Sequence, residues 1–137
     1  MSVKIYIDTN IYLNSILNRD KNISRDMFIF LSEMDVELYL NDLSIMNIHY
    51  IIRKKFDRDF IKKELKMIQS EHNLVSIDRE IIENALDSEF KDFEDGVQYY
   101  CAKRVNADVI ITDNIKDFKL SDIKVMSAKE FHNEFIT

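Results

Sequence analysis

The sequence contains no proline and only one glycine among its 137 residues. Antiparallel sandwiches and barrels use many glycine and proline turns, so this scarcity argues against them and favours regular helices with tight connections. The single cysteine, Cys101, cannot form an internal disulfide, which fits a reducing, cytoplasmic compartment. Residues 1–17 lack a basic segment followed by a long apolar run, so no signal peptide is expected. No apolar stretch approaches the ~20 residues of a membrane span.

The residues that are present can form a sizeable core, because 46% are hydrophobic and the aromatics include nine Phe and six Tyr. The length is that of one domain, which we expect to cover residues 1–137. A net charge of −6 does not suggest a general nucleic-acid coat. However, residues 53–66 carry seven basic side chains against three acidic ones. Such a stripe can attract a phosphate backbone, although a solvated helix face laced with ion pairs has the same pattern.

Short apolar runs alternate with helical patterns along the whole chain. We predict strands over 3–7, 36–40, 73–77, 108–112 and 123–126. We predict helices over 10–18, 23–34, 43–55, 58–70, 79–88, 93–105 and 127–135, with a short helical turn near 115–118. This alternation indicates an α/β fold with a mostly parallel sheet and helices on both faces. Parallel strands end at one edge of a sheet, so Asp8 and the loop at Asp113 are expected to meet there.

Acidic and polar side chains cluster in three segments beside predicted strand or helix ends. They are Asp8-Thr9-Asn10, Asp92-Phe93-Glu94-Asp95, and Thr112-Asp113-Asn114 with Asp117. Several carboxylates brought together cannot all stay ionised unless a cation joins them, and Mg²⁺ suits such an oxygen-rich site. The alternative for Asp8, Asp113 or Asn114 is a capping role at a helix or turn.

The predicted helix over 93–105 contains the only glycine, Gly96. Glycine in a helix costs up to ~1 kcal/mol relative to alanine, which indicates a close approach to the backbone or a packing requirement. We predict that this helix buries a stripe formed by Phe93, Val97, Tyr100 and Cys101, and that Asp95 points away from that stripe.

Four segments in this order resemble a PIN domain, most nearly the small bacterial PIN proteins of the VapC toxin type. They are IYIDTNIYLN, NIHYIIRK, DFEDGVQYYCAKRVNADVIITDNIKDF and KVMSAKEF. The resemblance implies a three-layer α/β/α domain with a central parallel sheet. It also implies cleavage of RNA that depends on Mg²⁺ or Mn²⁺.

The resemblance assigns roles to individual residues. The implied catalytic residues are Asp8, Asp95, Asp113 and Asp117, and the implied metal ligands are Asp8, Asp95 and Asp113. The implied supporting residues are Thr9, Asn10, Asn47, Glu94, Thr112 and Asn114. Candidate RNA-binding residues are Arg53, Lys54, Lys55, Lys103, Arg104 and Lys116.

One position departs from the family pattern. The second PIN motif normally offers an acidic residue on its helix, and Asn47 stands at that position here. An amide oxygen can ligate Mg²⁺ but brings no charge, so metal binding is expected to be weaker.

Three functions remain open on the residues. The first is a metal-dependent endoribonuclease, the toxin of a toxin–antitoxin pair, with RNA as substrate, an antitoxin protein as partner and homodimers by resemblance. The second is a weakly active or inactive PIN-fold module that binds RNA or protein. The third is another Mg²⁺ enzyme on a doubly wound sheet, but the phosphatase pattern D-x-D-x-T is absent after the first strand. The adjacent acids of receiver domains are absent there too.

Overall fold

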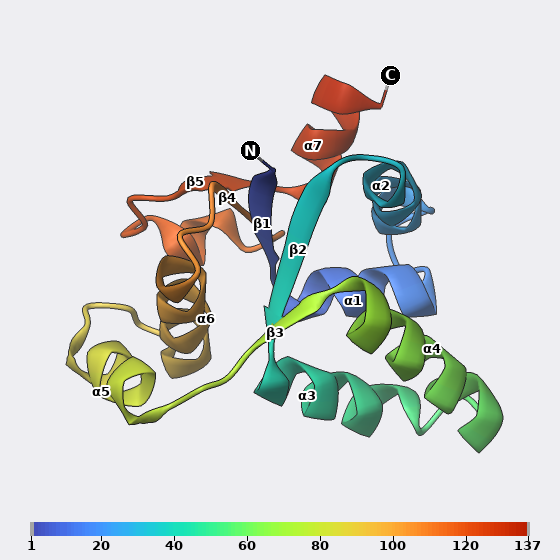
Figure 1. Ribbon diagram of the computed structural model, residues 1–137, viewed down its shortest axis with the longest axis horizontal. Coiled ribbons are helices and arrows are strands. Elements are labelled where there is room, and N and C mark those ends of the chain that lie inside the picture. The colour runs from blue at the N-terminus through green and yellow to red at the C-terminus, as the bar shows by residue number, and fades with distance from the viewer. Residues whose placement is uncertain (1, 137) are drawn as a thin grey trace.

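A computed structural model describes residues 2–136, which form a central sheet between helices (Figure 1). Met1 and Thr137, which the single-domain assignment includes, lie outside the described residues. The strands are β1 (Val3–Ile7), β2 (Val36–Asn41), β3 (Asn73–Val75), β4 (Val109–Ile111) and β5 (Lys124–Met126). All neighbouring strands are parallel, in the order β3-β2-β1-β4-β5, which confirms the predicted parallel α/β fold. The third, fourth and fifth strands are shorter than predicted, and the second is one residue longer.

The helices occur where the sequence pattern predicts them. They are α1 (Thr9–Leu17), α2 (Ile23–Ser32), α3 (Asp42–Ile52), α4 (Arg58–Glu71), α5 (Arg79–Asp87), α6 (Phe93–Arg104) and α7 (Ala128–Phe135), with a 3₁₀ turn η1 (Ile115–Phe118). The helices α4, α5 and α6 are each preceded by an aspartate, Asp57, Asp78 and Asp92, whose side chain accepts hydrogen bonds from backbone N–H groups of the first turn. These caps explain why the helices begin where they do. Within residues 2–136, no helix is long and apolar enough to cross a membrane.

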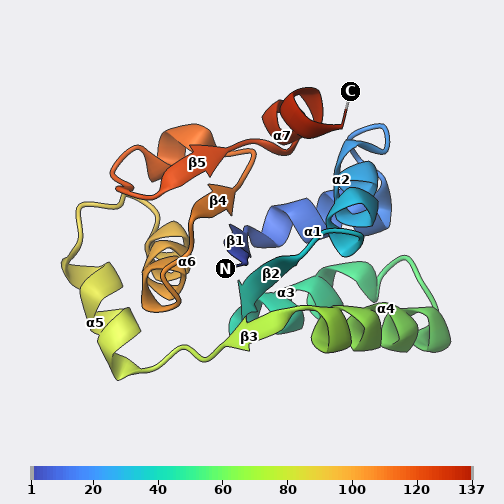
Figure 2. The same cartoon turned by 45° about the horizontal axis from the view of Figure 1, so that its top comes forward.

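The sheet separates two hydrophobic cores because alternate residues of a strand face opposite sides. Ile5 and Ile7 of β1 pack into the core under α1 to α4 and α7, whereas Tyr6 packs into the core under α5 and α6. Figure 2 shows α6 on one side of β1 and β4, and α1 on the other. The expected three-layer α/β/α arrangement is therefore confirmed.

At the central strand β1, the strand order of the sheet reverses. The chain first adds β2 and β3 on one side of β1, and then crosses over to add β4 and β5 on the other side. Open α/β sheets bind ligands at the carboxyl ends of the strands beside such a switch point. Here that position is the edge at which β1 ends with Ile7 and β4 ends with Ile111.

Candidate functional site

A polar pocket of about 340 Å³ opens at the carboxyl ends of β1 and β4. It is lined by Asp8, Thr9, Asn10, Asn47, Ile51, Asp92, Glu94, Asp95, Gln98, Asn114 and Asp117. Nearly half of these residues are acidic, and none of the described lining residues is basic. The pocket is therefore a region of strongly negative potential.

Asp8 is the most firmly held of these acids. Its side chain is 2% exposed, and its two oxygens accept different donors. Oδ1 accepts the Gln98 side-chain amide at 2.9 Å and the Asn10 backbone N–H at 3.3 Å, while Oδ2 accepts the Thr112 hydroxyl at 2.6 Å. The bond to Asn10 caps α1, so the capping alternative for Asp8 is correct as a description of its local role. The capping bond uses only part of one oxygen, so it is compatible with a second role in the pocket.

Asp95 is buried in the first turn of α6, where its backbone N–H is capped by Asp92. Its side chain is 8% exposed, and among the described residues no donor bonds to its carboxyl group. The pKa of Asp95 is raised to about 7, mainly by burial and then, in decreasing order, by the nearby carboxylates of Asp92, Asp8, Asp117 and Glu94. The charged form of this group is thus crowded by like charges and lacks a compensating partner.

The segment after β4 sends its polar side chains in two directions. Asn114 and Asp117 line the pocket, whereas Asp113 does not. Asp113 instead accepts the Asn14 side-chain amide at 2.9 Å and the Ala128 backbone N–H at 3.3 Å. Because Ala128 begins α7, Asp113 supports the start of that helix, and the expectation that it joins the other acids is not met.

Thr112 and Thr9 support the pocket from behind. The Thr112 hydroxyl donates to Asp8 and accepts the Asn114 backbone N–H at 3.0 Å, so it links β4 to the central strand. The Thr9 hydroxyl lies 2.6 Å from that of Ser44, which connects the start of α1 to α3. Asn47 is one turn further along α3 and lines the pocket, as the motif comparison predicts.

Sequence reasoning missed Gln98, and it described the buried face of α6 only in part: Val97 and Cys101 of the predicted stripe are buried. Phe93 is 46% exposed, whereas Asp95, Gln98 and Tyr99 are buried. Residues three apart on a helix lie on the same face, so the spacing from Asp95 to Gln98 is the signal that could have found it. Asp92 belongs to one of the acidic segments of the sequence but is not among the predicted site residues, yet it lines the pocket.

The basic candidates fall into two groups. The guanidinium carbon of Arg53 lies 4.5 Å from the ring centre of the exposed Tyr50, and the Lys54 ammonium lies 5.2 Å from it. Lys55 and Lys116 are exposed. By contrast, Lys103 pairs with Asp122 at 2.9 Å and Arg104 pairs with Asp78 at 2.9 Å. These two lie at the far end of α6, roughly 12 Å along the helix from Asp95, and do not flank the pocket.

The donor chemistry of the pocket fits a hard divalent cation. Carboxylate and amide oxygens dominate the lining, and no histidine or cysteine of the described chain lies among them. Within residues 2–136, no three His, Cys, Asp or Glu side chains are already arranged as a metal cluster. The observation in favour of a cation is therefore the crowding around Asp95, which a positive charge would relieve.

Comparison with known proteins agrees with this architecture. A family model described as PIN domain matches residues 4–116. The chain is 25% identical over 139 residues to Ribonuclease VapC1 of Aquifex aeolicus (strain VF5), which covers 95% of this chain and 94% of that protein. It is also similar in structure to VapBC2 from Rickettsia felis bound to a DNA fragment from its promoter. There the TM-score is 0.68 at 14% identity, with 91% of this chain and 98% of that one covered.

A second similar structure is a toxin-antitoxin complex from Klebsiella pneumoniae, with a TM-score of 0.65 at 20% identity over 90% of this chain and 97% of that one. The family model spans most of the chain, from β1 to the loop after β4, and includes both Asp8 and Asp95. The chain therefore belongs to the PIN-domain family.

Proposed function

We propose that the protein is a divalent-metal-dependent endoribonuclease and the toxin of a toxin–antitoxin pair. The observation that carries this proposal is the buried, unbonded carboxyl group of Asp95 beside Asp8, with Asp117 and Glu94 close enough to raise its pKa. A group of acids in a pocket at the switch point of a parallel sheet is suited to holding a cation. The name of the Aquifex relative, a ribonuclease, supports RNA as the substrate.

In this proposal Asp8, Asp95 and Asp117 hold Mg²⁺ or Mn²⁺, directly or through water, while Asp113 is left out. Bound there, the ion would supply Lewis-acid chemistry at the phosphodiester. Asp8 is suited to its role because hydrogen bonds to Gln98 and Thr112 fix its rotation before any ligand arrives. Asn10, Asn114 and Glu94 line the same pocket and are proposed to orient substrate or water.

The runner-up is a PIN-fold module that binds RNA or protein with little or no cleavage. Asn47 favours it, because a neutral amide stands in the pocket at a position where the family usually has an acid. The two functions differ in metal affinity. Calorimetry with Mn²⁺ separates them, since an enzyme must bind the ion at concentrations that support cleavage.

We propose single-stranded or looped RNA as the substrate. Its phosphates would be steered by Arg53, Lys54, Lys55 and Lys116, the candidates without an ion pair to an acidic side chain among the described residues. Lys103 and Arg104 are not part of this proposal because both are already paired away from the pocket. A cytoplasmic location is proposed as well, on the single free cysteine, which fits a reducing compartment.

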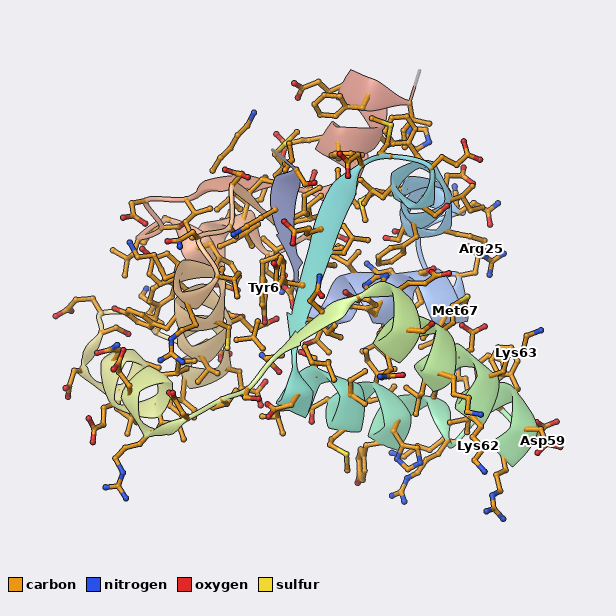
Figure 3. The ribbon with its side chains drawn as sticks, viewed as in Figure 1. Tyr6, Arg25, Asp59, Lys62, Lys63 and Met67 are labelled. Carbon is orange, nitrogen blue, oxygen red and sulfur yellow. The ribbon has the colours of Figure 1, made fainter. Side chains whose placement is uncertain are left out.

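An antitoxin partner is supported by the Klebsiella complex and by a second cavity of this chain. The cavity, of about 690 Å³, lies between α1, α2, β2 and α4 and includes the exposed side chains of Ile29, Met34 and Met67. Figure 3 shows Arg25 on α2 and Met67 on α4, two of the three helices that border it. We propose that an apolar antitoxin segment occupies this cavity, and that a basic or aromatic tail masks Asp8 and Asp95.

We also propose that the protein forms a homodimer. Light scattering tests this proposal, which a monomer at micromolar concentration would contradict.

The test of the enzymatic proposal compares RNA cleavage by the wild type, Asp8→Asn and Asp95→Asn in Mn²⁺. Both variants are expected to lose at least ~100-fold in kcat/KM, because each removes a charge from the cation site. Ser24→Ala is the matched control, because Ser24 is buried and hydrogen-bonded to Asp20 outside the pocket. Full activity of Asp8→Asn would contradict the proposal. So would growth arrest on expression that Asp95→Asn does not relieve.

A further inference from the structure

Gln98 connects the pocket to the buried interior through both ends of its side-chain amide. The Gln98 nitrogen donates to Asp8 Oδ1 at 2.9 Å. Its oxygen accepts the Thr9 backbone N–H at 3.3 Å and the Tyr6 hydroxyl at 3.4 Å. Because two donors converge on the oxygen, the amide is held with its nitrogen toward the Asp8 carboxylate.

The orientation of this amide is maintained by groups further inside the protein. The Asn41 side-chain amide donates to the Tyr6 hydroxyl at 3.0 Å, and Tyr6 in turn donates to Gln98. The Asn41 oxygen accepts the Ser44 backbone N–H at 2.7 Å, which ties the chain of bonds to the start of α3. Tyr6 is fully buried between the sheet and α6 (Figure 3). Asn41 donates to Tyr6, Tyr6 donates to Gln98, and Gln98 donates to Asp8. Hydrogen bonds that follow one another in the same direction polarise one another and so become stronger.

We propose that Gln98 is a positioning residue that fixes the rotation of the Asp8 carboxylate for a divalent cation. This inference rests on the proposed metal-dependent function. Gln98 holds Oδ1 and Thr112 holds Oδ2, so a rotation of the carboxylate would break hydrogen bonds at both oxygens. Oδ1 also accepts the Asn10 backbone N–H, which leaves one acceptor position, on Oδ2, for a cation in the pocket that Asp8 lines. Groups that orient a metal ligand in this way contribute as much as 10- to 100-fold to affinity in other proteins, by order of magnitude.

The choice of a neutral donor at this position is consistent with that role. Gln98 is 7% exposed and touches the same carboxylate that a lysine or arginine would neutralise. A cationic side chain there would compete with the metal ion for Asp8 and would relieve the negative potential of the pocket. An amide supplies the hydrogen bond without adding a charge, so the attraction for a cation is preserved.

The test measures Mn²⁺ affinity by calorimetry for the wild type and Gln98→Met, which keeps the side-chain volume but removes all three hydrogen bonds. We expect the variant to bind Mn²⁺ about 10-fold or more weakly, and to lose kcat with little change in KM for RNA. Two controls accompany it: Gln69→Met, at an exposed glutamine of α4, and Ser24→Ala, which removes a buried hydrogen bond elsewhere. Both controls should retain wild-type affinity.

The result that overturns the inference is unchanged Mn²⁺ affinity in Gln98→Met together with a loss of stability like that of Ser24→Ala. Should Gln98→Met fail to fold, nuclear magnetic resonance of the wild type decides instead. Addition of Mg²⁺ must shift the side-chain amide signal of Gln98 and leave that of Gln69 in place, and equal behaviour of the two would refute the role. A wild type that binds Mn²⁺ but leaves RNA intact contradicts the enzymatic proposal alone. The Mn²⁺ affinities of the wild type and Gln98→Met still test the role of Gln98 in that case.

Discussion

Asp95 is a carboxyl group whose ionised form is disfavoured by the folded protein. Burial, assisted by neighbouring carboxylates, raises its pKa from 3.8 to about 7. The folded state therefore retains a proton that the unfolded state releases, so stability declines as the pH rises from about 4 to about 7. We predict that the stability of metal-free Asp95→Asn does not decline in this way. At pH 8 its free energy of unfolding should exceed that of the wild type by on the order of 2 kcal/mol.

Urea unfolding of both proteins at pH 4 and pH 8, without metal, measures this difference. Saturating Mn²⁺ should reduce it, because a bound cation offsets the repulsion felt by the ionised group. Equal stabilities of wild type and variant at both pH values would show that the carboxyl group is better solvated than its burial indicates.

Asn47 is the residue at which an acidic side chain should increase the affinity of the pocket for a divalent cation. It lines the pocket, so Asn47→Asp adds a carboxylate without moving the backbone. We predict that Mn²⁺ binding tightens by about 3- to 10-fold, in line with one more charge near the ion. Cleavage is expected to persist, with half-maximal activity at lower Mg²⁺. Calorimetry on Asn47→Asp, with Asn133→Asp on α7 as a surface control, measures the effect, and identical affinities of wild type and Asn47→Asp would remove Asn47 from the site.

At the scale of the elements, Gly96 lies on α6 where this helix faces α5 and the loop that follows it. A Cβ atom at this position would meet Ala85 Cβ and Phe90 Cβ at 3.4 Å, which is ordinary contact. Neither a close approach to the backbone nor a packing requirement, the two expectations from the sequence, therefore excludes an alanine here. We predict that Gly96→Ala is accommodated and gains up to ~1 kcal/mol from helix propensity, whereas Gly96→Leu destabilises the protein. Thermal unfolding tests this, and a destabilised alanine variant would mean that the two helices are closer in solution.

Most elements could be predicted because each carries its own local signal. Strand β4, for example, is a short β-branched run, Val109-Ile110-Ile111, buried on both faces as parallel strands are. Helix α4 has apolar residues at helical spacing and an aspartate cap. The inward face of α6 was not predictable in the same way, because this helix is buried almost all round and its apolar residues do not select one side.

The candidate site was predicted in part, because some of its residues belong to sequence motifs whereas others are placed only by tertiary contacts. Asp8 and Asp95 follow from their motifs, and both line the pocket. Asp113 and Asp117 both follow β4 within a few residues, and only the tertiary position of α7 decides that Asp113 turns toward Ala128. Gln98 could not be predicted because its amide is uncharged and belongs to no motif, and because its hydrogen bonds join it to Asp8 and Tyr6, about 90 residues earlier in the chain.

At the scale of the whole molecule, an acidic protein must bind a polyanion through a local basic surface. Residues 53–66 provide one beside the end of α3, whereas Lys103 is neutralised by Asp122. We predict that replacing Arg53, Lys54 and Lys55 by alanine weakens RNA binding and flattens its salt dependence by about 0.7 per lost phosphate contact. Lys103→Ala, the matched control, should change neither. Binding measured across a series of salt concentrations tests this, and an equal effect of Lys103→Ala would relocate the RNA path.

The strand order β3-β2-β1-β4-β5 has a consequence for how the protein is made. A growing chain that has emerged through β3 already contains Asp8, but Asp95, Thr112 and Asp117 are still to be synthesised. The pocket cannot assemble until β4 pairs with β1 and the turn after it has left the ribosome, so a nascent chain that ends before this turn would lack the proposed cation site. Stop codons anywhere before position 117 would yield inactive fragments. A genetic selection for survivors of the proposed toxin should therefore recover nonsense mutations at any codon before position 117, while missense survivors should concentrate around the pocket.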